Sequence, residues 1–324
     1  MSNIQEPKES RFSPKLLAGI ILALLFGIAL YLRVSLPYDK VFTGEWIKFT
    51  GIDVYYHIRL VDNLVHNFPH YMSIDPYFLY PGATTGEIQI RFFDWLLASL
   101  IWLIGLGSPT EHTVDVVGVY YPAVLGALTV IPVYFIGKVL FNNWAGIASA
   151  GLIALLPGEF MGRSILGFAD HDVANTLFTT VSILFLLLAI NTAKQRQLTF
   201  KHINRQDWSV ATKPLIYSLL AGIFLGMYLL MWMGALLFVF ILTVYFIIQF
   251  IIDHLKRQST GYLCLIGIPL FFAALLVFLP MSPGWVHLAS LVIAILIPLV
   301  MSGTSWFMAR SQIKPVYYPL TVVG

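Results

Sequence analysis

Long apolar stretches recur along this chain and constrain its fold more than any other feature of the sequence. The first runs from Leu16 to about Leu36, and a helix of about 20 such residues can cross the hydrocarbon core of a bilayer. Charged residues make up only 11% of the 324 residues, whereas soluble domains contain about 25%. Backbone polar groups inside a bilayer need internal partners, and helices provide them. The sequence therefore predicts an all-α polytopic membrane protein.

About eight spanning helices and the start of a ninth are expected. They lie at about 16–36, 113–137, 144–161, 173–192, 214–231, 234–252, 261–280 and 285–302, and the ninth begins within 315–324. The third of them needs Pro157 inside its last turn, which is unfavourable in a helix. Residues 92–106 contain only about 15 apolar residues, a length that suits a re-entrant or interfacial segment.

The distribution of basic residues predicts the orientation of the bundle. If residues 92–106 do not cross the membrane, 13 of the 19 lysines and arginines fall on one side and five on the other. The positive-inside rule assigns the basic side to the cytoplasm. Residues 1–15 are then a cytoplasmic N-terminus, and 16–324 form the transmembrane domain. Its outer loops, 37–112 and 158–172, face away from the cytoplasm.

The first outer loop contains a predicted amphipathic helix over residues 51–70, because apolar residues recur there at helical spacing. Asp53 lies just before its first turn. The simplest interpretation of Asp53 is an N-cap, since an aspartate side chain accepts hydrogen bonds from free backbone N–H groups. His57 and His66 lie on the same helix, and we expect both at the level of the lipid headgroups rather than at a metal ion.

The second outer loop places Asp170 and Asp172, with His171 between them, directly before an apolar helix. One carboxylate can cap that helix, but a second exceeds what capping needs. Two carboxylates separated by one residue can also bind a hard cation such as Mg²⁺ or Mn²⁺. A short acidic pair is a weak signal by itself, so both interpretations stand on the residues alone.

Three longer motifs resemble one known family. They are GIDVYYHIRLVDNLVHNFPH at 51–70, GEFMGRSILGFADHDVAN at 158–175 and MYLLMWMGALLFVF at 227–240. They are similar to the catalytic subunit of oligosaccharyltransferase in its archaeal single-subunit form, a dolichyl-phosphooligosaccharide–protein glycosyltransferase. The resemblance runs from about Leu16 to the end of the chain. It implies a bundle like that of the type C glycosyltransferases, in an archaeal plasma membrane, with its active side outside the cytoplasm.

The resemblance also implies an activity, its partners and its site. Members of this family transfer an oligosaccharide from a dolichyl phosphate or pyrophosphate donor to the asparagine of an Asn-x-Ser/Thr sequon, with inversion. The expected partners are the lipid-linked donor, an acceptor polypeptide and membrane lipid. Asp53, Asp170 and Asp172 correspond to catalytic residues that surround Mn²⁺ or Mg²⁺, while Arg163 and His171 correspond to residues near the donor phosphate.

Two family motifs do not occur in these 324 residues. One is a later outer-loop Thr/Ser-Ile/Val-x-Glu motif, whose glutamate completes the site. The other is the WWDYG motif of a soluble C-terminal domain that reads the sequon. We therefore expect this chain to correspond to the N-terminal transmembrane part of the family, without that soluble domain, and to be inactive alone.

Two other functions remain alternatives. An ion-coupled transporter also uses carboxylates in a membrane bundle, although the acidic residues here lie in loops and at helix starts. A related glycosyltransferase could use the same lipid-linked donor with a non-protein acceptor. The net charge of +3 is small and scattered, so nucleic acid is not an expected partner. The single cysteine, Cys264, excludes a disulfide framework.

Overall fold

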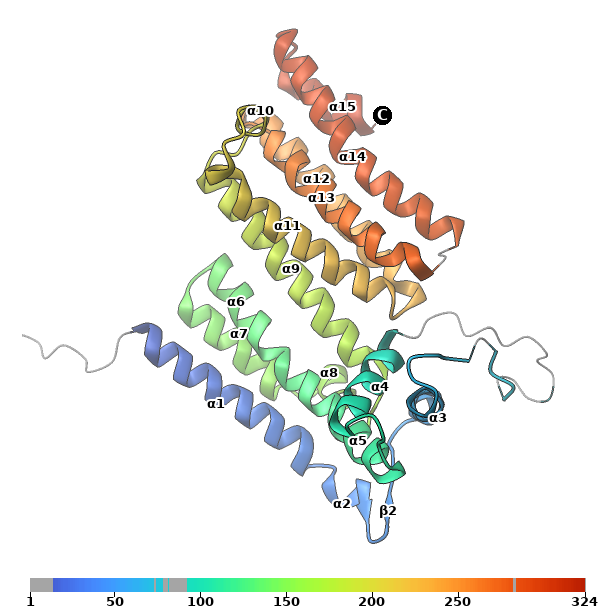
Figure 1. Cartoon of the computed structure of the whole chain (residues 1–324). Helices are drawn as coiled ribbons and strands as arrows, with labels where there is room; N and C mark the ends of the chain where they lie inside the picture. Colours follow the sequence, from blue (N-terminus) through green and yellow to red (C-terminus); the bar gives the residue numbers. More distant parts are fainter. Residues whose placement is uncertain (1–13, 73, 78–80, 82–91, 282–283, 324) are drawn as a thin grey trace, which may run out of the picture.

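A computed structural model describes residues 14–72, 74–77, 81, 92–281 and 284–323 of the chain. Helices form most of the described structure (Figure 1). The longer ones are α1 (Pro14–Ser35), α3 (Ile52–His66), α4 (Phe92–Ile104), α5 (Glu111–Leu128), α6 (Val130–Leu140), α7 (Asn143–Leu155), α9 (His171–Gln195), α11 (Trp208–Leu229), α12 (Leu236–Leu255), α13 (Gly261–Phe278) and α14 (Trp285–Arg310).

Short elements connect these helices. They are α2 (Tyr38–Val41), α8 (Glu159–Gly162), α10 (Phe200–Asn204), α15 (Tyr318–Val323) and the 3-10 turns η1 (Met233–Ala235), η2 (Leu279–Met281) and η3 (Pro315–Tyr317). The strands β1 (Phe42–Thr43) and β2 (Trp46–Ile47) pair antiparallel, with Phe42 opposite Ile47.

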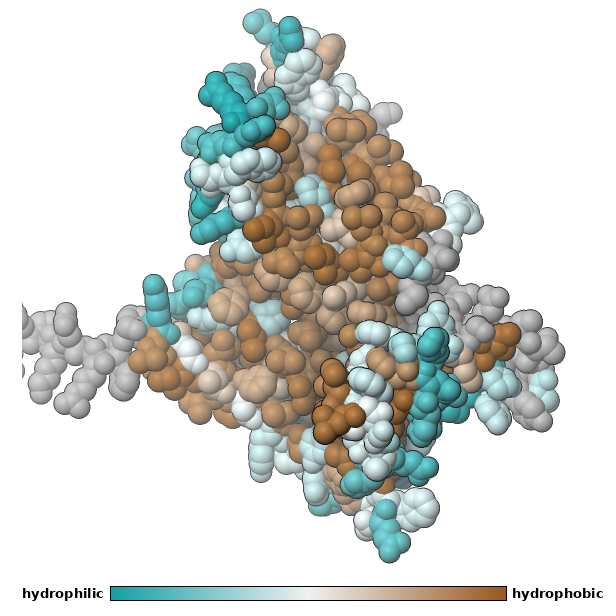
Figure 2. Space-filling model, viewed as in Figure 1, coloured by the Kyte–Doolittle hydropathy of each residue, from teal (hydrophilic) through white to brown (hydrophobic). Residues whose placement is uncertain are grey.

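The expected all-α membrane fold is confirmed. Within the described residues, seven helical segments are long and apolar enough to cross a membrane: Lys15–Val41, Glu111–Leu140, His171–Gln195, Trp208–Leu229, Leu236–Leu255, Gly261–Phe278 and Trp285–Arg310. Hydrophilic side chains gather over α10 and near α3, while hydrophobic ones cover much of the bundle between these regions (Figure 2). The cytoplasmic N-terminal segment that the sequence predicts lies outside the described residues as far as residue 13.

One predicted span is shorter in the structure, and another is present but interrupted. The helix expected at 144–161 is wrong in length, because α7 has only 13 residues and ends before Pro157. Proline restricts the residue before it to extended conformations, so a helix ends there. The stretch expected at 113–137 divides into α5 and α6 at Thr129. Pro132 has no N–H to donate to the carbonyl of Leu128, which weakens the helix at that point.

The segment at 92–106 agrees with its prediction. Helix α4 has 13 residues and falls below the length of the spanning helices. It packs against α3 and α5 at the end of the bundle where α9 begins (Figure 1). This end, called the outer end below, holds both predicted site loops, whereas α10 lies at the opposite, inner end.

Close helix packing depends on small residues. A Cβ atom added at Gly222 of α11 would lie 2.1 Å from the carbonyl oxygen of Leu270 in α13. A Cβ atom at Gly146 of α7 would lie 2.6 Å from the carbonyl oxygen of Tyr134 in α6. Small residues let helix backbones approach this closely. In lipid the hydrophobic effect does not favour helix association, so the bundle depends on van der Waals contacts of this kind. Close packing of this kind determines how the helix ends are placed relative to one another at the outer end.

Candidate active site

The start of α9 forms the centre of the candidate site. Asp170 is the N-cap residue of this helix, and its Oδ1 atom accepts a hydrogen bond from the backbone N–H of His171 at 2.6 Å. Its carboxylate is buried although it carries charge, with only 3% of the residue exposed. Capping is therefore one role of Asp170. A buried carboxylate needs further partners, however, because burial disfavours an unpaired charge.

The loop before Asp170 is held by backbone hydrogen bonds to two other elements. The N–H of Gly167 donates to the carbonyl of Val119 in α5 at 2.8 Å, and the N–H of Thr50 donates to the carbonyl of Gly167 at 2.9 Å. Gly167 has a φ of +86°, and a Cβ atom there would lie 3.0 Å from Thr50 Oγ1. Only glycine adopts this conformation readily. These contacts fix the path of the chain into Asp170.

A buried arginine supports the same loop from the other side. The Nε atom of Arg33, at the end of α1, donates to Ser164 Oγ at 2.8 Å. Its remaining nitrogens donate to the carbonyls of Ala29, Ala154 and Ile153 at 3.1 to 3.2 Å. The last carbonyls of a helix have no partner within the helix, so Arg33 satisfies those at the end of α7. The guanidinium thereby joins α1, α7 and the second outer loop.

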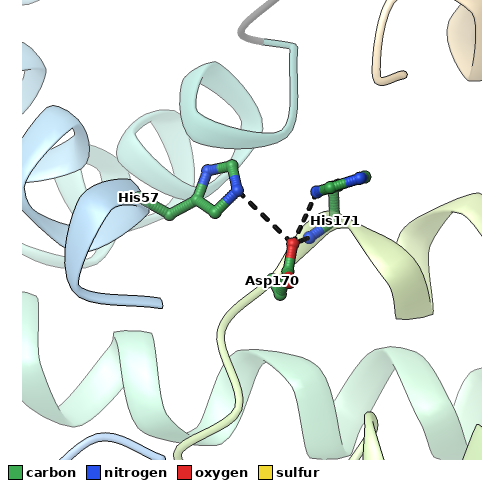
Figure 3. Close-up of side chains that lie close together, drawn as sticks. All are labelled: His57, Asp170 and His171. Atoms are coloured by element: carbon green, nitrogen blue, oxygen red, sulfur yellow. Dashed lines mark hydrogen bonds and ion pairs between the residues drawn. The ribbon is translucent and has the colours of Figure 1, made fainter. Parts of the chain in front are cut away.

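His57 brings α3 to the same point. Its Nδ1 atom lies 2.6 Å from Oδ1 of Asp94 in α4. Its Nε2 atom lies 3.4 Å from Oδ1 of Asp170, and Figure 3 shows this contact. The residue is only 9% exposed. His57 is therefore enclosed by protein side chains, whereas His66 is exposed; the expected position of both at the headgroup level stays a prediction.

Two sequence signals could have indicated this histidine and its partner. His57 lies three residues after Val54 and four before Val61, on the apolar face of the predicted helix. Asp94 is the one charged residue in the apolar stretch 92–107. A charge in such a stretch is expensive and points to a function or a partner.

His57 and Asp170 shift one another's pKa values. Burial alone would lower the pKa of His57, but the charges of Asp94 and Asp170 outweigh burial and raise it to about 10. Burial alone would raise the pKa of Asp170, but the close imidazoles of His171 and His57 hold it well below its usual range. Asp170 is therefore a carboxylate at neutral pH. A cation that bound His57 would have to displace a proton.

His171 completes a cluster of potential metal ligands. Its Nδ1 atom lies 2.5 Å from Asp170 Oδ1, yet the two are not aligned as a hydrogen bond, and this buried nitrogen has no other hydrogen-bond partner. One ligand-type atom from each of His57, Asp170 and His171 lies within 4.8 Å of the others. Imidazole nitrogens and carboxylate oxygens are ligands that divalent metal ions accept. The cluster therefore fits a cation.

Asp53 lies elsewhere on the first outer loop. It is exposed in the first turn of α3, where Gly51 is the N-cap residue and no side chain caps the helix. The interpretation of Asp53 as an N-cap is therefore wrong. Among the described residues, Asp53 does not belong to the cluster of His57, Asp170 and His171. Its convergence with Asp170 and Asp172 on one cation stays a prediction.

Asp172 and Arg163 form an ion pair beside the cluster. The guanidinium of Arg163 bonds to Asp172, and its Nε atom donates to Glu159 Oε2 at 2.9 Å. Hydrogen bonds to Glu159 and Asp172 raise the pKa of Arg163 above its ordinary value. All three side chains line a cavity of about 400 Å³, whose other lining residues are Phe160, Val173, Asn175, Thr176, Tyr228 and Trp232. The cavity beside Asp172 is thus lined by a cationic group and by aromatic rings.

Comparison with known proteins identifies the family. The family described as "Oligosaccharyl transferase STT3, N-terminal" matches residues 16–322. The chain belongs to this family. The resemblance that the three sequence motifs predict is therefore confirmed.

Several archaeal members of the STT3 family are similar to this chain. The dolichyl-monophosphooligosaccharide–protein glycotransferase AglB of Haloferax volcanii is 30% identical over 315 residues, which cover 94% of this chain and 30% of that protein. A dolichyl-phosphooligosaccharide-protein glycotransferase of Archaeoglobus fulgidus is 29% identical over 273 residues, or 83% of this chain and 30% of that protein. The chain thus spans about a third of the length of these relatives.

Solved structures of the family share the fold. An oligosaccharyltransferase AglB from Archaeoglobus fulgidus, in complex with an inhibitory peptide and a dolichol-phosphate, superimposes with a TM-score of 0.82 and 26% identity, over 95% of this chain and 36% of that chain. An Archaeoglobus fulgidus oligosaccharyltransferase in complex with Zn and sulfate superimposes with a TM-score of 0.77 and 26% identity, over 94% and 38%. The bundle described above therefore shares its fold with part of these solved oligosaccharyltransferases.

Proposed function

We propose that this chain forms the membrane-embedded part of an enzyme that transfers an oligosaccharide from a lipid-linked donor to asparagine in Asn-x-Ser/Thr sequons. The donor is a dolichyl phosphate or pyrophosphate. The observation that supports this most directly is the buried carboxylate of Asp170, held at the head of α9 beside a cavity with a cationic and aromatic lining. The names of the archaeal relatives, which describe protein glycotransferases, agree with this activity.

The proposed site includes Mn²⁺ or Mg²⁺, held by Asp53, Asp170 and Asp172. Both cations prefer oxygen ligands, and carboxylates provide them. When bound, such a cation supplies Lewis-acid stabilisation of the negative charge that develops on the departing phosphate. Support comes from Asp170, whose carboxylate belongs to the one cluster of potential metal ligands found among the described residues.

The side chains of the chain itself prepare the acceptor. The lone pair of an amide nitrogen is delocalised into its carbonyl group, so this nitrogen is a poor nucleophile. Carboxylates of Asp53 and Asp170 that accept hydrogen bonds from the acceptor N–H groups would weaken that conjugation and orient the nitrogen. The nitrogen then forms a bond to the anomeric carbon while the bond to the phosphate oxygen breaks, with inversion. The leaving electron pair stays on the phosphate, and the amide proton passes to a carboxylate.

Arg163 and His171 are proposed to bind the donor phosphate. A guanidinium presents paired N–H donors that match phosphate oxygens. Arg163 lines the cavity next to Asp172, and it is half-exposed, so a phosphate can reach it. Arg163 already bonds to Glu159 and Asp172. A donor phosphate that binds Arg163 would therefore have to replace one of these two carboxylates.

The active side is proposed to face outward from the plasma membrane of an archaeon. The basic residues concentrate in the segments at the inner end, which the positive-inside rule places in the cytoplasm. The polyprenyl chain of the donor needs a hydrocarbon environment, which explains why the site lies at the end of a membrane bundle.

The test uses the complete protein in which this chain occurs, solubilised in detergent with lipid-linked oligosaccharide, Mn²⁺ and a labelled peptide. Transfer to an Asn-x-Thr peptide but not to a Gln-x-Thr peptide is expected, and Asp53→Ala and Asp170→Ala should each abolish it. Asp207→Ala is the matched control, because Asp207 lies in the loop between α10 and α11 at the inner end. Transfer of the sugar to lipid alone, or wild-type rates in both variants, would refute the proposal.

A further inference from the structure

We infer that His57, held in place by Asp94, is a positioning residue that fixes the carboxylate of Asp170. This inference rests on the proposed function in one respect, namely that Asp170 binds the cation and the acceptor. His57 is not one of the residues that the family resemblance marks, and it lies on a different outer loop from Asp170.

The geometry forms a chain of three side chains from three helices. Asp94 comes from the first turn of α4, His57 from the middle of α3 and Asp170 from the N-cap of α9. The two imidazole nitrogens lie 2.6 Å from Asp94 and 3.4 Å from Asp170. All three residues are at least nine-tenths buried. Water therefore has little access to replace any of these contacts.

The contact with Asp94 determines what the other nitrogen does. A carboxylate at 2.6 Å can only accept a hydrogen bond when ionised, so the hydrogen on that side of the ring belongs to Nδ1 of His57. The ring is then oriented with Nε2 toward Asp170. The ring of Phe93 packs edge-on against the imidazole with centroids 5.3 Å apart, which further limits rotation.

A positioning role explains a feature that a structural tie alone does not. A simple link between α3 and α4 would need only Nδ1 and Asp94. Instead Nε2 also points at the one buried carboxylate of the second outer loop (Figure 3). Asp170 has a second anchor at the backbone N–H of His171, so two contacts from different elements define the orientation of its carboxylate. Residues that orient a ligand in this way typically affect metal affinity by about 10–100-fold.

The two nitrogens of His57 can be separated by substitution. The amide of His57→Asn reaches the Nδ1 position and can still bond to Asp94, but it does not reach Asp170. The amide of His57→Gln reaches the Nε2 position and can still donate toward Asp170. His66→Asn is the control, because His66 is exposed on the same helix.

The experiment measures Mn²⁺ affinity by electron paramagnetic resonance on the complete protein in detergent, together with kcat, KM and thermal unfolding. We expect His57→Asn to weaken Mn²⁺ binding and lower kcat by about 10–100-fold, with KM for the peptide little changed. His57→Gln should restore most of both. Asp94→Asn keeps an acceptor for Nδ1 and should act in the same direction with a smaller effect, which gives a milder second variant if His57→Asn unfolds.

Several outcomes would overturn the inference. One is wild-type Mn²⁺ affinity and kcat in both His57→Asn and Asp94→Asn. Another is near wild-type Mn²⁺ affinity and kcat in His57→Asn together with a loss of both in His57→Gln. That result would mean that His57 only links α3 to α4. Asp170→Asn separates this inference from the proposed function. If Asp170→Asn loses transfer while the His57 variants do not, only the positioning role fails, and if Asp170→Asn keeps wild-type transfer, the proposed function fails.

Discussion

Two buried polar clusters lie at opposite ends of the bundle, and their differences separate a site from a structural contact. The outer cluster contains His57, Asp170 and His171. The inner cluster is centred on Asp253 at the end of α12. There Asp253 accepts hydrogen bonds from the hydroxyl of Tyr262 at 2.6 Å and from Nε2 of Gln249 at 2.7 Å.

The histidines of the two ends have different neighbours. His254, next to Asp253, bonds through Nδ1 to Ser305 Oγ at 2.8 Å and stacks on Tyr318 with centroids 4.1 Å apart. Thr260 donates to the same serine oxygen at 2.9 Å. These contacts join α12 to α14 and α15 through neutral hydroxyl groups. His57 instead lies between two carboxylates.

The comparison teaches that burial of a charged residue does not by itself indicate function. Each carboxylate oxygen of Asp253 receives a neutral donor from a neighbouring side chain, so this group is satisfied by the fold. Around Asp170 the neighbours are imidazoles that can also bind a metal ion. Cavities do not separate the two ends, because one of about 400 Å³ opens beside Asp172 and one of about 410 Å³ is lined by Thr260 and Ser305. Each cluster contains one buried histidine nitrogen without a hydrogen-bond partner, Nδ1 of His171 and Nε2 of His254. Among the described residues, only the outer cluster brings three potential metal ligands together.

The largest expected effect comes from a pair of matched substitutions. Asp170→Asn keeps the helix cap, since asparagine and aspartate cap about equally well, but it removes the charge. We expect the transfer rate to fall by about a thousandfold or more, equivalent to about 4 kcal/mol of transition-state stabilisation, with thermal unfolding nearly unchanged. Asp253→Asn should leave the rate per folded molecule unaltered. Equal loss of rate in the two variants would erase the distinction between the clusters.

A smaller effect on stability is expected at the inner end. Tyr262→Phe removes the hydroxyl that donates to buried Asp253, and an unsatisfied buried acceptor costs about 1–3 kcal/mol. Thermal unfolding in detergent should therefore occur at lower temperature, while transfer activity of the folded protein stays at the wild-type level. Tyr317→Phe, at an exposed position, is the control. A loss of activity without a loss of stability would give the inner cluster a functional role.

Removing one hydroxyl between the helices should have a milder effect. Ser305→Ala takes away the partner of both His254 and Thr260, and a single net hydrogen bond contributes about 1 kcal/mol. Ser290→Ala on the same helix, whose exposed hydroxyl bonds only to the carbonyl of Val286 in the preceding turn, should change unfolding less. Equal effects of the two changes would show that the bond to His254 adds nothing.

The smallest effect concerns an ion pair of the first outer loop. Arg59 contacts both oxygens of buried Asp75, at 2.6 and 2.5 Å, and these bonds hold the pKa of Asp75 below its ordinary value of 3.8. A lowered pKa contributes stability above pH 3.8, which is lost as the pH falls through the folded-state value.

Arg59→Gln should therefore destabilise the protein by under about 1 kcal/mol at neutral pH, because Arg59 is partly exposed and the backbone N–H of Tyr77 still donates to Asp75. The difference from wild type should shrink in acid, and transfer should be unaffected. Thermal unfolding at pH 7 and near pH 3 checks this. If the stability difference between Arg59→Gln and wild type grew in acid, the ion pair with Asp75 would not be its cause. A large loss of transfer would mean that this ion pair also contributes to function.

The sequence determined the membrane fold and marked candidate residues of the site. Apolar length and the positions of charges act within a single segment, so they predicted the long helices, the amphipathic helix α3 and the short α4. The acidic pair before α9 and the family motifs marked Asp170 and its neighbours. An error arose where a local backbone effect decided the boundary, at Pro157 after α7.

Only the tertiary structure decided which side chains meet at the outer end. His57 is 37 residues from Asp94 in sequence and lies on another loop than Asp170, so no periodic pattern connects the three. Their meeting depends on how close α3, α4 and α9 pack and on the backbone bonds that fix Gly167 against Thr50 and Val119. Hydrophobic patterning specifies which face of a helix is buried, but the side chain that it meets there is decided by packing between helices.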